Sequence, residues 1–135
     1  MTIKNVVTTL PVQNLEKTLA FYRDGLGWET DGIDEGTLMF ELPNFSLFFN
    51  EMDQFNHYTG PANVKALDIM GSSVETLFSC AFEKQEMVDD LLKKAEEAGG
   101  EITPAQELDG SYTGYFRDLD GHLWQLIWNK YTAAS

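Results

Sequence analysis

The chain has 135 residues, of which 43% are hydrophobic and 13% aromatic, enough to build the packed core of one domain. Nine Lys and Arg stand against 22 Asp and Glu, and the resulting formal charge of −13 argues against nucleic acid or an anionic membrane as a partner. A single cysteine, Cys80, excludes a disulfide framework and a multi-cysteine zinc site. The first residues show no signal-peptide pattern and no apolar run has membrane-spanning length, so we expect a cytoplasmic protein.

The first half of the chain predicts a strand, a helix and three short strands. Residues 3–12 are rich in Val, Ile and Thr, as strands are. Asn14 is placed to cap a helix whose apolar face recurs at helical spacing and which Gly25 and Gly27 end. Short strands are predicted near 28–34, 37–42 and 45–50, and residues 51–63 form a polar linker with about one helical turn.

The second half repeats this order. Residues 77–83 predict a strand, and a helix follows whose apolar face ends before Gly99 and Gly100. Strands are predicted near 101–107, 111–118 and 123–129, with a turn at Asp120 and Gly121 before the last of them.

This repetition predicts an α+β fold made of two βαβββ modules that pair around an open cleft. One domain covers residues 1–135, with module one at about 1–50, a connection at about 51–76 and module two at about 77–130. Because the helix of each module covers only one face of its sheet, we expect the bare faces to form the binding cleft.

Two segments resemble a known family. Residues 10–29, LPVQNLEKTLAFYRDGLGWE, resemble the opening of the vicinal-oxygen-chelate superfamily, which includes glyoxalase I, extradiol dioxygenases, and fosfomycin- and bleomycin-resistance proteins. Residues 114–129, GYFRDLDGHLWQLIWN, resemble its closing hairpin, and residues 88–102 its second helix. The resemblance implies paired βαβββ modules and a homodimer, but it does not fix a reaction.

Metal-dependent members of this superfamily hold one divalent ion with two His or Glu side chains from each module. The resemblance places the corresponding positions at Val7 and Phe48 in module one. In module two it places them at Cys80, or at Ser79 if the register differs by one residue, and at Gln125. These side chains do not make a site for a hard cation, so we expect no metal and no other cofactor.

The superfamily's ligand positions also imply which residues face the cleft, because side chains alternate along a strand. In module two, Tyr115 matches a position where fosfomycin-resistance members place a ligand-contacting Tyr. In module one we expect Leu38 and Ser46 to face inward, together with Phe40, whose orientation depends on the hairpin register. The predicted ligand-binding residues are Val7, Thr9, Phe40, Phe48, Thr113, Tyr115, Arg117 and Gln125.

Each of these residues also has a purely structural interpretation. Val7 and Phe48 could fill the cleft as core, and Tyr115 could be a plain wall residue. Gln125 is harder to explain in this way, because a buried amide needs a hydrogen-bonding partner. Cys80, in an apolar strand, is more typical of a small buried side chain than of a nucleophile.

Four functional hypotheses follow. The leading one is a metal-free protein that binds a small organic molecule, in particular a cationic aromatic one, as bleomycin-resistance members do. The alternatives are a metal-dependent lyase, isomerase, dioxygenase or thiol transferase of the same superfamily, a metal-free enzyme that uses Tyr115 or Arg117, and a structural protein whose cleft is filled. The sequence does not identify the ligand.

Overall fold

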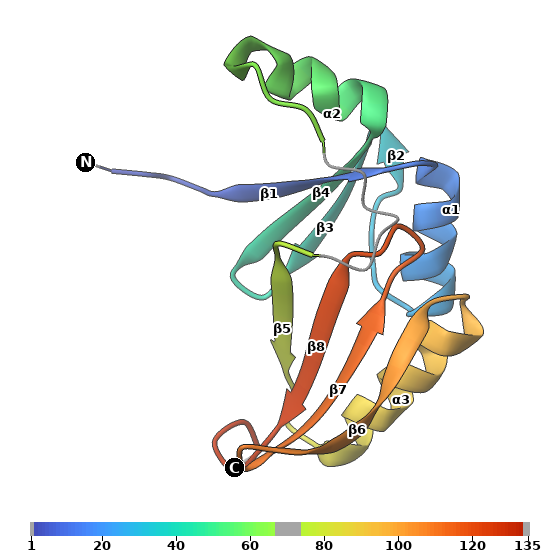
Figure 1. Ribbon diagram of the computed structural model, residues 1–135, viewed down its shortest axis with the longest axis vertical. Helices are drawn as coiled ribbons and strands as arrows, with labels where there is room; N and C mark the ends of the chain where they lie inside the picture. Colours follow the sequence, from blue (N-terminus) through green and yellow to red (C-terminus); the bar gives the residue numbers. More distant parts are fainter. Residues whose placement is uncertain (1, 67–73, 134–135) are drawn as a thin grey trace. The chain divides into compact units, whose positions relative to one another are not determined.

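A computed structural model describes residues 2–66 and 74–133. The chain forms two compact units, Met1–Asp68 and Ile69–Ser135, called unit one and unit two below. Each unit contains a four-stranded sheet with both parallel and antiparallel neighbours, and a helix lies against it (Figure 1). The fold is therefore α+β, as the sequence predicts. Within the described residues, no helix is long and apolar enough to span a bilayer.

Unit one has strand order β1-β4-β3-β2. Strand β1 pairs in parallel with β4, and β3 pairs antiparallel with both β4 and β2. Its elements are β1 (Val7–Val12), α1 (Leu15–Leu19), the π-helix η1 (Ala20–Gly25), β2 (Ile33–Asp34), β3 (Thr37–Leu42), β4 (Phe45–Glu51), α2 (Met52–Thr59) and the 3-10 helix η2 (Gly60–Ala62).

The first helix begins as predicted. The side chain of Asn14 accepts a hydrogen bond from the backbone N–H of Lys17 at 3.0 Å, which caps the first turn. Tyr22, on the helical segment, is fully buried and packs against the rings of Phe40 and Phe49 at centroid distances of 5.5 and 5.1 Å. These rings form the core between the helical segment and the sheet.

Three predicted boundaries in unit one differ from the structure. Strand β1 begins at Val7 rather than at residue 3, and its pairing with β4 begins at Ser46, the partner of Val7. Residues 28–32 are irregular, so β2 keeps only two of the seven predicted residues. The polar linker contains α2, an eight-residue helix, and residues 67–73 of the predicted connection lie outside the described residues.

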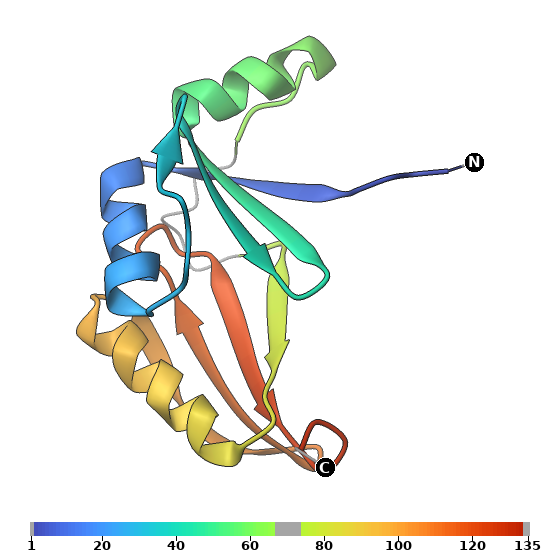
Figure 2. The same cartoon turned by 180° about the vertical axis from the view of Figure 1, so that it is seen from behind.

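Unit two repeats the topology of unit one, with strand order β5-β8-β7-β6. Here β5 pairs in parallel with β8, and β7 pairs antiparallel with β8 and β6. Its elements are β5 (Leu77–Ala81), α3 (Gln85–Glu97), β6 (Glu101–Leu108), β7 (Ser111–Arg117) and β8 (Leu123–Trp128). Each unit is thus a βαβββ arrangement, as the internal repetition predicts, and both views show α3 along one face of its sheet (Figures 1 and 2).

Aromatic side chains form much of the core of unit two. Trp124 is 1% exposed and stacks between Phe78 and Phe116, with centroid distances of 4.7 and 6.0 Å. The helix covers this face with the predicted apolar residues of α3, which are Val88, Leu91, Leu92 and Ala95. The opposite face of the sheet therefore carries the other residues of each strand.

Candidate functional site

The distal face of each sheet is the face turned away from the helical segment α1–η1 in unit one and from α3 in unit two. In unit one, Thr9 is paired with Phe48, and Val7 lies two residues before Thr9 on the same strand. Phe48 is also paired with Met39 across the hairpin. Paired residues on neighbouring strands point to the same side, so these four side chains share the distal face.

Phe40 does not share this face, so the expectation that it faces the ligand side is wrong. Its partner on β4 is Leu47, one residue away from Phe48, and side chains alternate along a strand. Phe40 is 1% exposed and packs against Tyr22 in the core. Leu38, two residues earlier, is fully buried on the same side, so its inward assignment is wrong for the same reason.

A cavity of about 930 Å³ lies within unit one, against the distal face. It is lined by residues 27–32, by Arg23 and Asp34, and by Thr37, Met39, Glu41 and Phe48. Of the predicted ligand-binding residues, the cavity includes only Phe48. Its volume is in the range of pockets that hold drug-sized molecules.

The end of the first helix builds one wall of this cavity. In η1 the backbone hydrogen bonds join residues five apart in the sequence, as in a π-helix. The N–H of Leu26, for example, donates to the carbonyl of Phe21 at 2.9 Å. Gly27 then adopts φ +80°, a left-handed conformation that glycine tolerates best, and the chain turns into the cavity wall. Such π-helical turns are frequent at functional sites.

A side-chain hydrogen bond holds the irregular wall against the sheet. The hydroxyl of Thr30 donates to the carbonyl of Met39 at 2.6 Å and accepts from the N–H of Gly32 at 3.2 Å. Trp28 is anchored by ring contacts with Tyr22 and Phe40, at 5.2 and 6.1 Å between centroids. The wall therefore presents an aromatic side chain whose position is fixed by the core.

The cavity lining is strongly acidic. It carries four carboxylates and one guanidinium, that of Arg23. Arg23 is itself paired with Asp24 at 2.9 Å, and this hydrogen bond and charge lower the pKa of the Asp24 carboxyl and raise that of the guanidinium. The four carboxylates are those of Glu29, Asp31, Asp34 and Glu41. Such a lining favours a cationic guest over an anionic one.

The distal face of unit two brings together the predicted residues of that module. Tyr115 is paired with Gln125, and Thr113 and Arg117 lie two residues to either side of Tyr115 on β7. Thr113 is 2% exposed, whereas Tyr115 and Gln125 are half-buried. The Nε of Arg117 donates to the carbonyl of Gly121 at 3.2 Å, so this side chain also braces the turn before β8.

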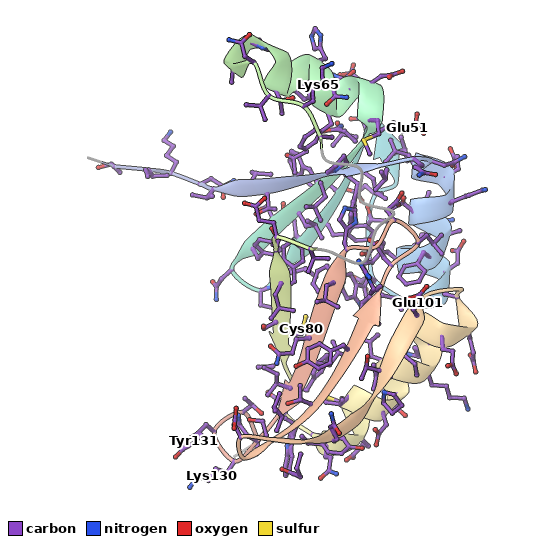
Figure 3. All side chains as sticks on the ribbon, viewed as in Figure 1. Glu51, Lys65, Cys80, Glu101, Lys130 and Tyr131 are labelled. Carbon is purple, nitrogen blue, oxygen red and sulfur yellow. The ribbon has the colours of Figure 1, made fainter. Side chains whose placement is uncertain are left out.

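The structure resolves the register around Cys80. Ser79 is the partner of Gln125, and its hydroxyl donates to the Oε1 of Gln125 at 2.8 Å. Cys80 points to the other face of β5, where its partner is Leu126 (Figure 3). Burial raises the pKa of the Cys80 thiol from 9.0 to about 11, which fits a half-buried structural side chain and not a nucleophile.

The residues at the expected metal-ligand positions do not fit a divalent cation. Val7 and Phe48 have no lone pair to donate, and Gln125 and Ser79 are hydrogen-bonded to each other. Within residues 2–66 and 74–133, no group of three or more His, Cys, Asp or Glu side chains is placed to hold a metal ion. The absence of a bound metal in solution remains a prediction.

The two histidines lie elsewhere. His57 is exposed on α2. The Nδ1 of His122 is 2.8 Å from the Oδ2 of Asp118, and the N–H groups of Asp120 and His122 donate to the other oxygen of that carboxylate. Asp118, Asp120 and His122 are all buried, so this group stabilises the turn between β7 and β8.

The cavity wall at residues 27–32 was not predicted, because residues 28–32 were interpreted as part of a strand and Gly27 as the end of the helix. Gly27, Asp31 and Gly32 are residues typical of turns, and this was the signal that could have identified an irregular wall. Met39 and Glu41 were missed because the predicted alternation along β3 placed Leu38 and Phe40 on the ligand side in their stead.

Comparison with known proteins gives the family. A sequence model of the Glyoxalase/Bleomycin resistance protein/Dioxygenase superfamily matches residues 4–126. No curated protein was found that matches the chain.

Solved structures agree in fold. A hypothetical protein, SA1046, from S. aureus is 25% identical with a TM-score of 0.79, and the match covers 94% of each chain. A glyoxalase-related enzyme from Fulvimarina pelagi is 23% identical with a TM-score of 0.78, covering 94% of this chain and 89% of that one. The fosfomycin resistance protein FosX from Listeria monocytogenes, solved with Mn(II) and sulfate, is 20% identical with a TM-score of 0.67, covering 96% and 93%. The family match over residues 4–126, together with the repeated βαβββ topology, shows that this chain belongs to the Glyoxalase/Bleomycin resistance protein/Dioxygenase superfamily.

Proposed function

We propose that this protein binds a small organic cation that carries an aromatic ring, and that it does so without a divalent metal ion. The observation that supports this most directly is the cavity of unit one, in which acidic side chains surround an apolar surface. A binding protein of this kind acts as a homodimer that sequesters its ligand, as the family resemblance implies.

The apolar part of the cavity suits an aromatic ring. Trp28, Met39 and Phe48 line it, and aromatic and thioether groups stack well on planar ligands. A positive charge over the face of Trp28 or Phe48 is attracted by the ring, an interaction worth about 0.5–2 kcal/mol. Val7 and Thr9 lie on the same sheet face as Phe48 and extend the predicted contact surface.

The carboxylates supply the preference for positive charge. Glu29, Asp31 and Asp34 are exposed, and Glu41 accepts a hydrogen bond from the hydroxyl of Ser46 at 2.8 Å. Because exposed ion pairs contribute only about 0–1 kcal/mol each, no single carboxylate decides binding, and their sum favours a cation. The residues at the expected metal positions give the second support, because Val7 and Phe48 have no donor atom and Ser79 and Gln125 supply neutral oxygens without a carboxylate or an imidazole.

A matched pair of probes tests the proposal. In calorimetric titrations, p-aminobenzamidine, a cation, should bind roughly threefold to tenfold more tightly than the neutral 4-aminobenzamide of nearly the same shape. Raising the salt concentration should narrow this difference because salt screens exposed charges. Equal affinities, or no saturable binding of p-aminobenzamidine, would contradict the proposal.

Charge variants locate the site. The changes Asp31→Asn and Glu41→Gln should each weaken binding of p-aminobenzamidine, and the two together should weaken it further. Glu97→Gln, at an exposed position of α3, removes the same charge from a residue that does not line the cavity and is the matched control. If the control weakens binding as much as the cavity variants, the cation is held by the overall charge and not by this site.

A further inference from the structure

Three side chains form a row of hydrogen bonds across the distal face of unit two. They come from three neighbouring strands, with Ser79 on β5, Gln125 on β8 and Tyr115 on β7. The hydroxyl of Ser79 donates to the Oε1 of Gln125 at 2.8 Å, and the Nε2 of Gln125 donates to the hydroxyl oxygen of Tyr115 at 3.3 Å. The row lies wholly within unit two.

The amide of Gln125 gives this row a direction. Its oxygen can only accept and its nitrogen can only donate, so contact with Nε2 makes the oxygen of Tyr115 an acceptor. The hydroxyl hydrogen of Tyr115 is then free to donate elsewhere, and no hydrogen bond donated by this hydroxyl is seen among residues 2–66 and 74–133. Tyr115 is half-buried on the distal face, so its hydrogen is accessible there.

We infer that Ser79 and Gln125 are positioning residues that fix Tyr115 as a hydrogen-bond donor to a carbonyl oxygen of a small molecule. A neutral oxygen acceptor is the suitable partner because the formal charge of −13 disfavours an anionic one. Gln125 occupies a position where the family resemblance expects a metal-binding carboxylate. At this position an acceptor-only group would turn the hydrogen of Tyr115 toward itself, whereas the amide leaves that hydrogen for the ligand.

This inference goes beyond the cation cavity of unit one, so it needs its own probes. Acetophenone and ethylbenzene have nearly the same shape, and only acetophenone has a carbonyl oxygen. In protein-observed NMR titrations with EDTA present, the wild-type protein should bind acetophenone about threefold to tenfold more tightly, as expected for one prealigned hydrogen bond. Shifts should centre on the side-chain amide of Gln125.

Two variants test the direction of the row. Tyr115→Phe keeps the ring and removes the donor, so it should abolish the preference for acetophenone while leaving ethylbenzene binding unchanged. Gln125→Glu keeps the tyrosine but offers it a carboxylate that only accepts, so this change should abolish the preference equally. Tyr112→Phe is the matched control, because Tyr112 lies on the same strand and faces the other way, with its hydroxyl donating to Asp89 at 2.6 Å.

The outcomes separate this inference from the proposed function. It is overturned if the wild type shows no preference, if Gln125→Glu leaves the preference intact, or if Tyr115→Phe weakens both probes equally. Thermal unfolding of each variant shows whether the fold is retained, and Gln125→Met offers a second test, since loss of the positioning amide should reduce the preference without removing the donor. Titration of the same samples with p-aminobenzamidine reports on the proposed function independently.

Discussion

Cys80 shows how burial alone decides the chemistry of a residue. Its half-buried thiol lies on the same face of the sheet as its pairing partner Leu126, on the edge strand β5 of unit two (Figure 3). Removing a thiolate from water is costly, so the pKa is raised from 9.0 to about 11. At neutral pH this side chain is therefore a protonated, apolar group.

This shift predicts slow alkylation. At pH 8 the folded protein should react with iodoacetamide about 100-fold more slowly than the chain unfolded in urea. The reason is that the pKa of the thiol differs by about two units between the two states, so the folded chain holds about 100-fold less thiolate. Mass spectrometry of quenched samples gives both rates, and Cys80 is the one cysteine that can react. Equal rates in the folded and unfolded chains would show that the fold does not shield the thiol from water.

The same shift has a consequence for stability. Between pH 9 and 11 the unfolded chain releases the thiol proton and the folded chain retains it, so the free energy of unfolding falls as the pH rises through this range. Cys80→Ala lacks this contribution. Between pH 8 and pH 11 the free energy of unfolding of the wild type should therefore fall relative to that of Cys80→Ala.

The orientation of some individual residues was predictable from the sequence, and that of others was not. The alternation rule placed Tyr115, Arg117 and Gln125 correctly on one face, because the turn at Gly121 fixes the register of β7 and β8. It failed for Phe40, because the β3–β4 hairpin at Pro43 and Asn44 shifts the pairing by one residue from that assumed. The role of Tyr115, Arg117 and Gln125 in binding remains a prediction.

At the scale of elements, the first helix is stabilised from a distant strand as well as by its own cap. The backbone N–H of Leu15, at the first helical position, donates to the Oε2 of Glu51 at 2.9 Å (Figure 3 labels Glu51 at the end of β4). Asn14 caps a second N–H of the same turn. A carboxylate at this end also complements the helix dipole.

Glu51→Ala should therefore lower the free energy of unfolding by about 1 kcal/mol, because one helical N–H loses its acceptor. Glu51→Gln keeps an acceptor and loses only the charge, so its loss should be about half as large. Urea denaturation followed by circular dichroism measures both. If Glu51→Gln and Glu51→Ala are equally destabilised, the charge and not the hydrogen bond connects β4 to the helix.

Regular elements were predictable because their patterns are local. The apolar face of α3 and the cap at Asn14 follow from residues within one or two turns, and both are confirmed. The shape of the segment 28–32 was not predictable, because it depends on a hydrogen bond from Thr30 to Met39 on a neighbouring strand. The turn residues Asp31 and Gly32 indicate that the segment is irregular, but not that it forms a wall of the cavity.

At the scale of the whole molecule, the structure shows an architectural duplication in which the two units differ in the residues they present. Both units share one topology, yet unit one carries an acidic aromatic cavity and unit two carries a row of neutral hydrogen-bonding groups. The repeat was predictable from the order of elements, and the family from two sequence segments. The pairing of the modules around a cleft and the homodimer remain predictions.

The central claim is that the protein binds an aromatic cation without the help of a divalent metal. The most direct test is titration of p-aminobenzamidine into EDTA-treated protein and into protein supplied with Mn(II) or Zn(II), with the metal content of each sample measured by elemental analysis. The donor set at Val7, Phe48, Ser79 and Gln125 predicts substoichiometric metal and the same affinity in both samples. Near-stoichiometric metal, together with binding that appears only when the metal is present, would contradict the account.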